Sequence, residues 1–278
     1  MIAVLSVVKH PPATRWARFK AHFHPYEITA GLRKHRKTSV LQVKYEIYRG
    51  GLQWQKLLPY LAGCRKQLLC DPDIDLSGTS FTRFENAAYT LRLMQNFVVT
   101  MLEQAAVSPH DLKIAYYDPM AVYPEMVTAL ASYTSCLTIV TDMPRFYENQ
   151  SDRLMSLYGI PLSISNCVEA LAGSDLILST EVIDAPWPLT AQSIVFTVKP
   201  PLVSLKGTIL SDYRVDLPYP YQRLKPPKVN NVYFLSALYS LCGVKDIEKL
   251  VPYQCSDRQS LFTSDRLSQR LRALRQSA

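Results

Sequence analysis

The sequence contains little glycine: only nine glycines occur in 278 residues. Phosphate-binding loops of the Walker and G-x-G-x-x-G types place several glycines close together, so that the backbone can approach a phosphate group. The sequence has no Walker motif, and the segment "KIAYYDPMAVYPEM" (113–126), which has the layout of a strand, a turn and a helix start, has no glycine. The G-x-S-x-G and H-E-x-x-H motifs are also absent, so no complete catalytic set is recognised.

Long apolar runs and paired cysteines are missing as well. The opening "MIAVLSVV" is too short to span a bilayer and lacks the basic start of a signal peptide, so it predicts a first strand. We therefore expect no membrane partner and a cytoplasmic location. The six cysteines show no C-x-x-C spacing, and several stand in apolar runs, which predicts reduced, buried thiols.

Acidic residues are nearly absent from the first 37 residues, where eight Lys and Arg face one Glu; this segment carries +7 of the chain's +8. The segment ends in "GLRKHRK", and its basic residues Arg33, Lys34, Arg36 and Lys37 are candidates for binding nucleic acid or another anion. The alternative is that they only form a solvated face. "HFH" could direct two imidazoles to one side, but no further ligand has a recognisable spacing, and no metal site is predicted.

The first 80 residues have the pattern of a small α/β lobe. "SVLQVKYEIYRGG" alternates apolar and polar side chains as a half-buried strand does, and "LQWQKLLPYLAG" and "KQLLC" follow as a helix and a short strand. Thr82 and Glu85 have the spacing of a capping box, so residues 81–110 are expected to form a connecting helix that begins near residue 83.

Residues 111–217 alternate between apolar strands and shorter helical segments. The expected strands are "KIAYYD", "LTIVTD", "PLSIS", "DLILST", "SIVFTV" and "GTILSDYRV", and Asn166 and Glu169 could cap one of the helices between them. This alternation predicts an α/β fold with a doubly wound, parallel, Rossmann-like sheet in the order 3-2-1-4-5-6. Residues 218–278 are expected to form a proline-rich strap followed by C-terminal helices.

Three stretches, "LTIVTD", "LYGIPLSIS" and "EALAGSDLILST", resemble the nicotinamide-binding half of Rossmann dehydrogenases of the shikimate dehydrogenase and glutamyl-tRNA reductase type. The resemblance covers about residues 113–215. It implies a degenerate NAD(P)-binding domain, and it transfers no catalytic residue, because the first 110 residues do not match a substrate domain of these families. The catalytic residues are therefore unknown.

Four residues follow strands that should end at one edge of the sheet: Asp118, Asp142, Thr180 and Lys199. Asp118 would bring a carboxylate towards a diphosphate, and Pro119 offers no N–H there. Asp142 either contacts an adenosine ribose or caps the next helix. Thr180 and Lys199 either line the ligand crevice or are ordinary polar residues of loops. NAD(P) is therefore disfavoured as a cofactor.

Three functions agree with these patterns. The first is a noncatalytic or ligand-sensing Rossmann-like module that has lost the glycine turn and binds an unknown small molecule in the crevice between the lobes. The second is an NAD(P)-dependent oxidoreductase with an atypical turn. The third is a basic scaffold that binds nucleic acid or another anion through residues 1–37.

Overall fold

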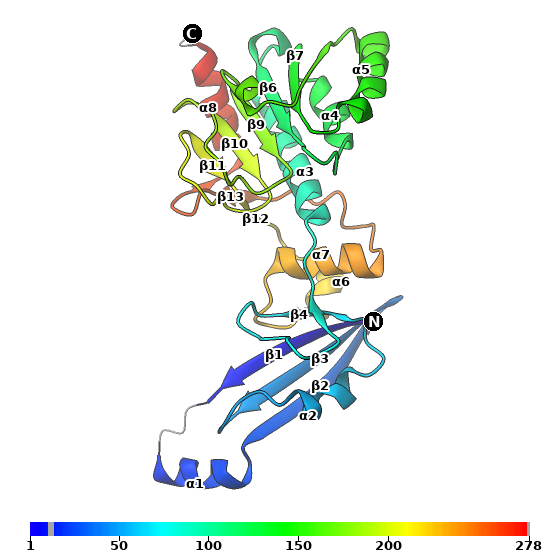
Figure 1. Cartoon of the computed structure of the whole chain (residues 1–278), viewed down its shortest axis with the longest axis vertical. Coiled ribbons are helices and arrows are strands. Elements are labelled where there is room, and N and C mark those ends of the chain that lie inside the picture. The colour runs from blue at the N-terminus through cyan, green and yellow to red at the C-terminus, as the bar shows by residue number, and fades with distance from the viewer. Residues whose placement is uncertain (11–13, 277–278) are drawn as a thin grey trace. The chain divides into compact units, whose positions relative to one another are not determined.

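The computed structural model describes residues 1–10 and 14–276, and the chain divides into two compact units. Unit 1 comprises Met1–Asn86 and Leu217–Ile247, and unit 2 comprises Ala87–Asp216 and Glu248–Ala278. The chain therefore passes between the units three times (Figure 1). The region 218–278, expected as one C-terminal part, is shared between the two units.

Unit 1 is built on a five-stranded sheet in the order β2-β3-β1-β4-β5. Its strands are β1 (Ile2–Lys9), β2 (Tyr26–His35), β3 (Thr38–Ile47), β4 (Gln67–Cys70) and β5 (Thr82–Arg83). All neighbouring strands are parallel except β2 and β3, which form an antiparallel hairpin. The strands expected at the chain start, in "SVLQVKYEIYRGG" and in "KQLLC" are confirmed as β1, β3 and β4. The sequence did not predict β2, because all ten of its residues are exposed or half-buried and give no apolar alternation.

Two helices, α2 (Trp54–Leu61) and α7 (Asn231–Cys242), pack on this sheet. Unit 1 also contains α1 (Arg15–Phe23) and the short α6 (Tyr219–Gln222). Leu57 and Leu61 of α2 pack in one cluster with Leu5 and Tyr45. The alternate β1 side chains, such as Val4, are buried as well, and α7 contacts β1. The Tyr233 hydroxyl of α7 also donates to the Phe84 carbonyl at 3.0 Å.

Unit 2 is built on a six-stranded parallel sheet in the order β11-β10-β9-β6-β7-β8. Its strands are β6 (Lys113–Tyr117), β7 (Cys136–Val140), β8 (Leu162–Ser165), β9 (Leu176–Ser179), β10 (Ile194–Thr197) and β11 (Thr208–Leu210). Numbered along the chain, this is the predicted order 3-2-1-4-5-6. The strand order confirms the expected α/β, doubly wound, Rossmann-like fold.

One face of the second sheet carries the larger core. The helices on it are α3 (Ala88–Ala105), α4 (Glu125–Ala131), α5 (Pro144–Tyr158) and α8 (Ser264–Gln276), which share one cluster of buried side chains with Ile114, Ile139 and Phe196 of the strands. Gly159 ends α5 in the left-handed conformation, as its position after a helical run predicts. A small antiparallel sheet of β12 (Asp212–Arg214), β13 (Gln254–Ser256) and β14 (Leu261–Phe262) belongs to the same unit.

The other face differs from the expectation of regular helices. It is covered by the 3-10 turns of η2 (Val168–Leu171) and by irregular segments that contribute Ile183 and Leu189. Prolines at 186, 188, 200 and 201 remove helical N–H donors from these connections. The predicted cap at Asn166 is wrong, because η2 begins after Cys167 and no side chain caps it.

Two further expectations were wrong in their boundaries. The capping box at Thr82 and Glu85 is not formed, because Thr82 and Arg83 add to the first sheet as β5 and α3 begins only after Ala87. "GTILSDYRV" is not one strand, since it divides into β11 and β12, which belong to different sheets. The structure also corrects the view of the cysteines, because Cys136 and Cys167 are exposed.

Candidate functional site

The turn after β6 is organised by the carboxylate of Asp118. This residue follows the strand directly and is fully buried. Its Oδ1 accepts hydrogen bonds from the Val122 N–H at 2.8 Å and from the Thr180 hydroxyl at 3.0 Å. Its Oδ2 accepts from the Tyr123 N–H at 3.0 Å, the Tyr147 hydroxyl at 2.6 Å and the Tyr116 hydroxyl at 3.3 Å. The single Tyr116 proton is also donated to the Tyr123 carbonyl, at the shorter distance of 2.7 Å, so four donors and a shared fifth converge on one buried carboxylate.

Two of these donors are backbone amides just ahead of α4. Free amides at this position, where a strand leads into a helix, bind the pyrophosphate in a Rossmann site. Here the Val122 and Tyr123 amides donate to an anion that belongs to the chain itself. The expectation that Asp118 extends towards a ligand is therefore wrong. Its side chain turns inward and accepts the hydrogen bonds of the Val122 and Tyr123 N–H groups in the turn.

The phenols around Asp118 remain donors at neutral pH. Burial raises the pKa of Tyr116 and of Tyr147 far above the ordinary value for a phenol, and the Asp118 carboxylate contributes to both shifts. Tyr147 lies on α5, 29 residues further along the chain, so no local pattern in the sequence links it to Asp118. This contact depends on how α5 packs against the sheet.

The other three predicted crevice residues have different surroundings. Thr180 is buried and contacts Asp118, so these two are brought together. Asp142 is exposed, and its backbone N–H donates to the Pro119 carbonyl at 3.0 Å. Its alternative role as a cap is not realised, because α5 has no side-chain cap. Lys199 is exposed, and the structure gives its side chain no contact with the other three.

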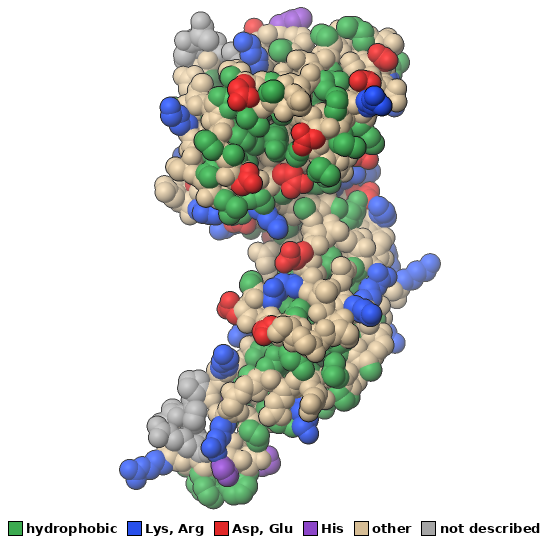
Figure 2. All heavy atoms as spheres, viewed as in Figure 1, with side chains coloured by type: hydrophobic (Ala, Val, Ile, Leu, Met, Phe, Trp, Pro, Cys, Tyr) green, Lys and Arg blue, Asp and Glu red, His purple; other side chains and the backbone are tan. Residues whose placement is uncertain are grey.

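Three acidic side chains lie near the same strand, and one of them, Asp184, was not singled out by sequence reasoning. The pKa of Tyr117, the last residue of β6, is raised by burial and then by the negative charges of Asp142, Asp184 and Glu181. Trp187 packs against the Tyr117 ring, with 4.9 Å between ring centroids. Acidic side chains are also visible across the face of unit 2 that Figure 2 shows. Carboxylates near this position oppose the binding of a diphosphate.

In the described part of the basic segment 1–37, the chain forms β1, α1 and β2. Arg33 and Lys34 are neighbours in β2 and so point to opposite faces, which means that the four candidate residues do not share one face. The Arg33 guanidinium donates to the Arg223 carbonyl at 2.7 Å. On α1, Trp16, Phe19 and Phe23 are exposed, and they form part of the apolar surface seen over that helix (Figure 2).

The anion-binding hypothesis predicts a specific response to charge removal. We expect the full chain to elute from heparin at lower NaCl when glutamine replaces Arg33, Lys34, Arg36 and Lys37, because heparin retention depends on counterion release. The matched control removes four exposed positive charges from other places: Arg145, Arg153, Lys206 and Lys249. An equal shift in both variants would show that only net charge matters and would contradict a site at residues 33–37.

Neither a metal centre nor a membrane span is found in the described part of the chain. No three His, Cys, Asp or Glu side chains among residues 1–10 and 14–276 are grouped so that they could hold a metal ion. No helix of these residues is both long enough and apolar enough to cross a bilayer.

No protein-family model and no curated protein matches the chain. Among solved structures, the A chain of dipicolinate synthase from Bacillus subtilis has a TM-score of 0.38 at 8% identity, covering 87% of this chain and 97% of that one. L-tryptophan dehydrogenase from Nostoc punctiforme has a TM-score of 0.35 at 10% identity, covering 99% and 81%. The Thermococcus litoralis Δ1-pyrroline-2-carboxylate reductase, solved with NADH and L-proline, has a TM-score of 0.29 at 10% identity. The matched region spans 66% of this chain and 61% of the length of the reductase.

Proposed function

We propose that the chain is a noncatalytic, ligand-sensing protein whose Rossmann-like unit does not bind NAD(P) at its first strand-turn-helix connection. The observation that carries this proposal is the Asp118 carboxylate, which accepts hydrogen bonds from the Val122 and Tyr123 backbone amides of the turn. The chain thus supplies an internal anion where a dinucleotide would place its pyrophosphate.

Binding a dinucleotide at this turn would require Asp118 to leave its position. The Val122 and Tyr123 amides and the Tyr147 hydroxyl would each lose their bond to this carboxylate. The displaced carboxylate would also lie close to a diphosphate, and two like charges at short distance repel each other. The alternative of an NAD(P)-dependent oxidoreductase with an atypical turn requires both of these unfavourable changes.

A thermal-shift experiment tests the proposal. A cofactor present at a hundred times its Kd stabilises the folded state by about 2.7 kcal/mol, which corresponds to roughly 5 to 10 °C in Tm for a unit of this size. We expect millimolar NAD or NADP to raise the Tm of the full chain by less than about 1 °C. Sodium pyrophosphate at equal ionic strength serves as the control for nonspecific anion effects.

The contrary outcome is equally definite. A rise of several degrees with NAD or NADP at tens of micromolar, which is lost on Asp142→Ala, would establish an adenosine-ribose contact. That result would reject the proposal in favour of the oxidoreductase.

A further inference from the structure

A cavity of about 660 Å³ opens in unit 1 at the carboxyl ends of β1, β3 and β4. The volume lies in the range of small-molecule sites. In the sheet, β1 stands between β3 and β4, so the chain continues from β1 to strands on opposite sides of it. Such a reversal of strand order at the carboxyl edge is where open α/β sheets bind ligands.

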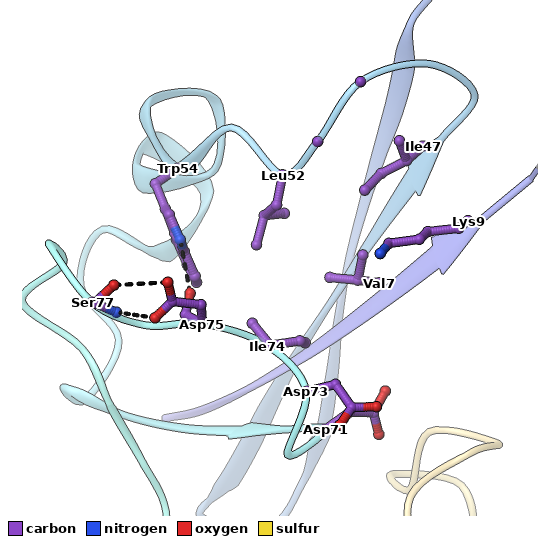
Figure 3. A pocket seen from close by; sticks show the side chains of 12 residues that line it. Val7, Lys9, Ile47, Leu52, Trp54, Asp71, Asp73, Ile74, Asp75 and Ser77 are labelled. Carbon is purple, nitrogen blue, oxygen red and sulfur yellow. Dashed lines mark hydrogen bonds between the residues drawn. The ribbon is translucent and has the colours of Figure 1, made fainter.

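The middle of the cavity is apolar. Figure 3 shows the side chains of Val7, Leu52 and Ile74 projecting into the same space, with the Trp54 ring at one side. The Trp54 indole N–H donates to the Asp75 carbonyl at 3.1 Å, which fixes the ring against the segment that follows β4. An aliphatic or aromatic group would be covered here on several sides.

The polar lining carries both signs of charge. The Lys9 ammonium group at the end of β1 is turned towards the space beside Val7 (Figure 3), and Lys9 forms no ion pair with the residues that the structure describes. Asp71, Asp73 and Asp75 line the cavity from the segment after β4. The Ser77 hydroxyl and N–H both donate to the Asp75 carboxylate at 2.8 Å and lower its pKa, so Asp75 is negatively charged at neutral pH.

The glycines that the turn of unit 2 lacks occur beside this cavity. Gly50 and Gly51 connect β3 to α2 and line the cavity, and Gly50 adopts a φ of 81°. A Cβ atom at either position would meet nothing within 4 Å, so the backbone here is open to a ligand. A simple anion would meet the three carboxylates, and a simple cation would meet Lys9.

We propose that this cavity binds a free α-amino acid with an apolar side chain. The carboxylate of the ligand pairs with Lys9, its ammonium group faces the acidic segment 71–75, and its side chain packs against Trp54, Leu52 and Ile74. The site extends the ligand-sensing part of the proposed function. It lies in unit 1 and does not depend on the Asp118 turn, so NAD(P) binding would reject the proposed function without changing the result here.

The test uses the full chain with Trp16→Phe and Trp187→Phe, so that Trp54 is the remaining tryptophan, and follows its fluorescence. The probes are L-phenylalanine, L-leucine, 3-phenylpropanoate, which lacks the amine, and 2-phenylethylamine, which lacks the carboxylate. We expect saturable binding of at least one of the two amino acids and at least tenfold weaker binding of both analogues.

Two variants test which residue binds each charged group of the ligand. Lys9→Gln should weaken amino-acid binding at least tenfold and leave the weak binding of 2-phenylethylamine unchanged, whereas Asp73→Asn should weaken the amino acid and not 3-phenylpropanoate. Lys56→Gln, an exposed change on α2 that does not line the cavity, is the matched control. The proposal is overturned if neither amino acid binds, if either analogue binds as tightly, or if Lys9→Gln has no effect.

Discussion

Replacing Asp118 with alanine is expected to lower the free energy of unfolding of unit 2 by about 3 kcal/mol or more, because each buried donor left without an acceptor costs about 1 to 3 kcal/mol. The change removes the acceptor for the Tyr123 N–H and the Tyr147 hydroxyl, and both of these bonds are buried. The effect should therefore exceed that of an ordinary surface substitution several times over.

Urea unfolding measures this change. Trp187 lies in unit 2, so its fluorescence reports on this unit in a background with Trp16→Phe and Trp54→Phe. Asp142→Ala is the matched control: this exposed carboxylate follows the neighbouring strand, and its loss should change stability by less than about 0.5 kcal/mol. Equal midpoints for the two variants would show that Asp118 does not organise the turn.

Gly207→Ala is expected to destabilise unit 2 by about 3 kcal/mol or more, since a clash with the backbone adds to backbone strain. Gly207 has a φ of 90°, and a Cβ atom placed there would lie 2.5 Å from the Ser193 carbonyl oxygen. That same oxygen accepts the Thr208 N–H at 2.9 Å, the bond that starts the pairing of β10 with β11. The methyl group would therefore force these two strands apart.

Gly173→Ala is the control that measures the cost of backbone strain without a steric clash. Gly173 also has a positive φ, of 73°, but a Cβ atom there would meet nothing within 4 Å. Its substitution should cost only the strain, about 1 to 2 kcal/mol. The same urea experiment compares the two variants, and an equal loss of stability would show that the contact with Ser193 is relieved by a small shift.

The sequence predicted the second sheet well because its signal is local. Runs such as Ile114 to Tyr116 and Leu176 to Leu178 are buried on both faces, and a continuous apolar run between polar turns is typical of a central parallel strand. α5 and α7 each end before a glycine in the left-handed conformation, Gly159 and Gly243, which is also a local signal. In each case the residues that determine the structure are adjacent in the chain.

The features that sequence reasoning missed depend on distant residues. Strand β2 has no apolar pattern of its own and is held by ten paired positions along β3. Thr82 looked like a helix cap, but its pairing with Gln67 makes it part of a strand. Asp118 accepts from the nearby Val122 and Tyr123 amides, but the Tyr147 and Thr180 hydroxyls that also bind it come from distant parts of the chain. A pattern within a short window contains none of this information.

The three passages of the chain between the units have a consequence for biosynthesis. Strands β1 to β5 are complete by residue 83, but α7, which contacts β1, is translated only with residues 231–242. At about 5 to 20 residues per second, the first sheet waits on the order of 10 s on the ribosome with an uncovered apolar face. Unit 2 likewise waits for α8, which packs on α3. A nascent chain of this protein therefore exposes apolar surface over most of its synthesis, and a gene cut after codon 86 would encode neither unit.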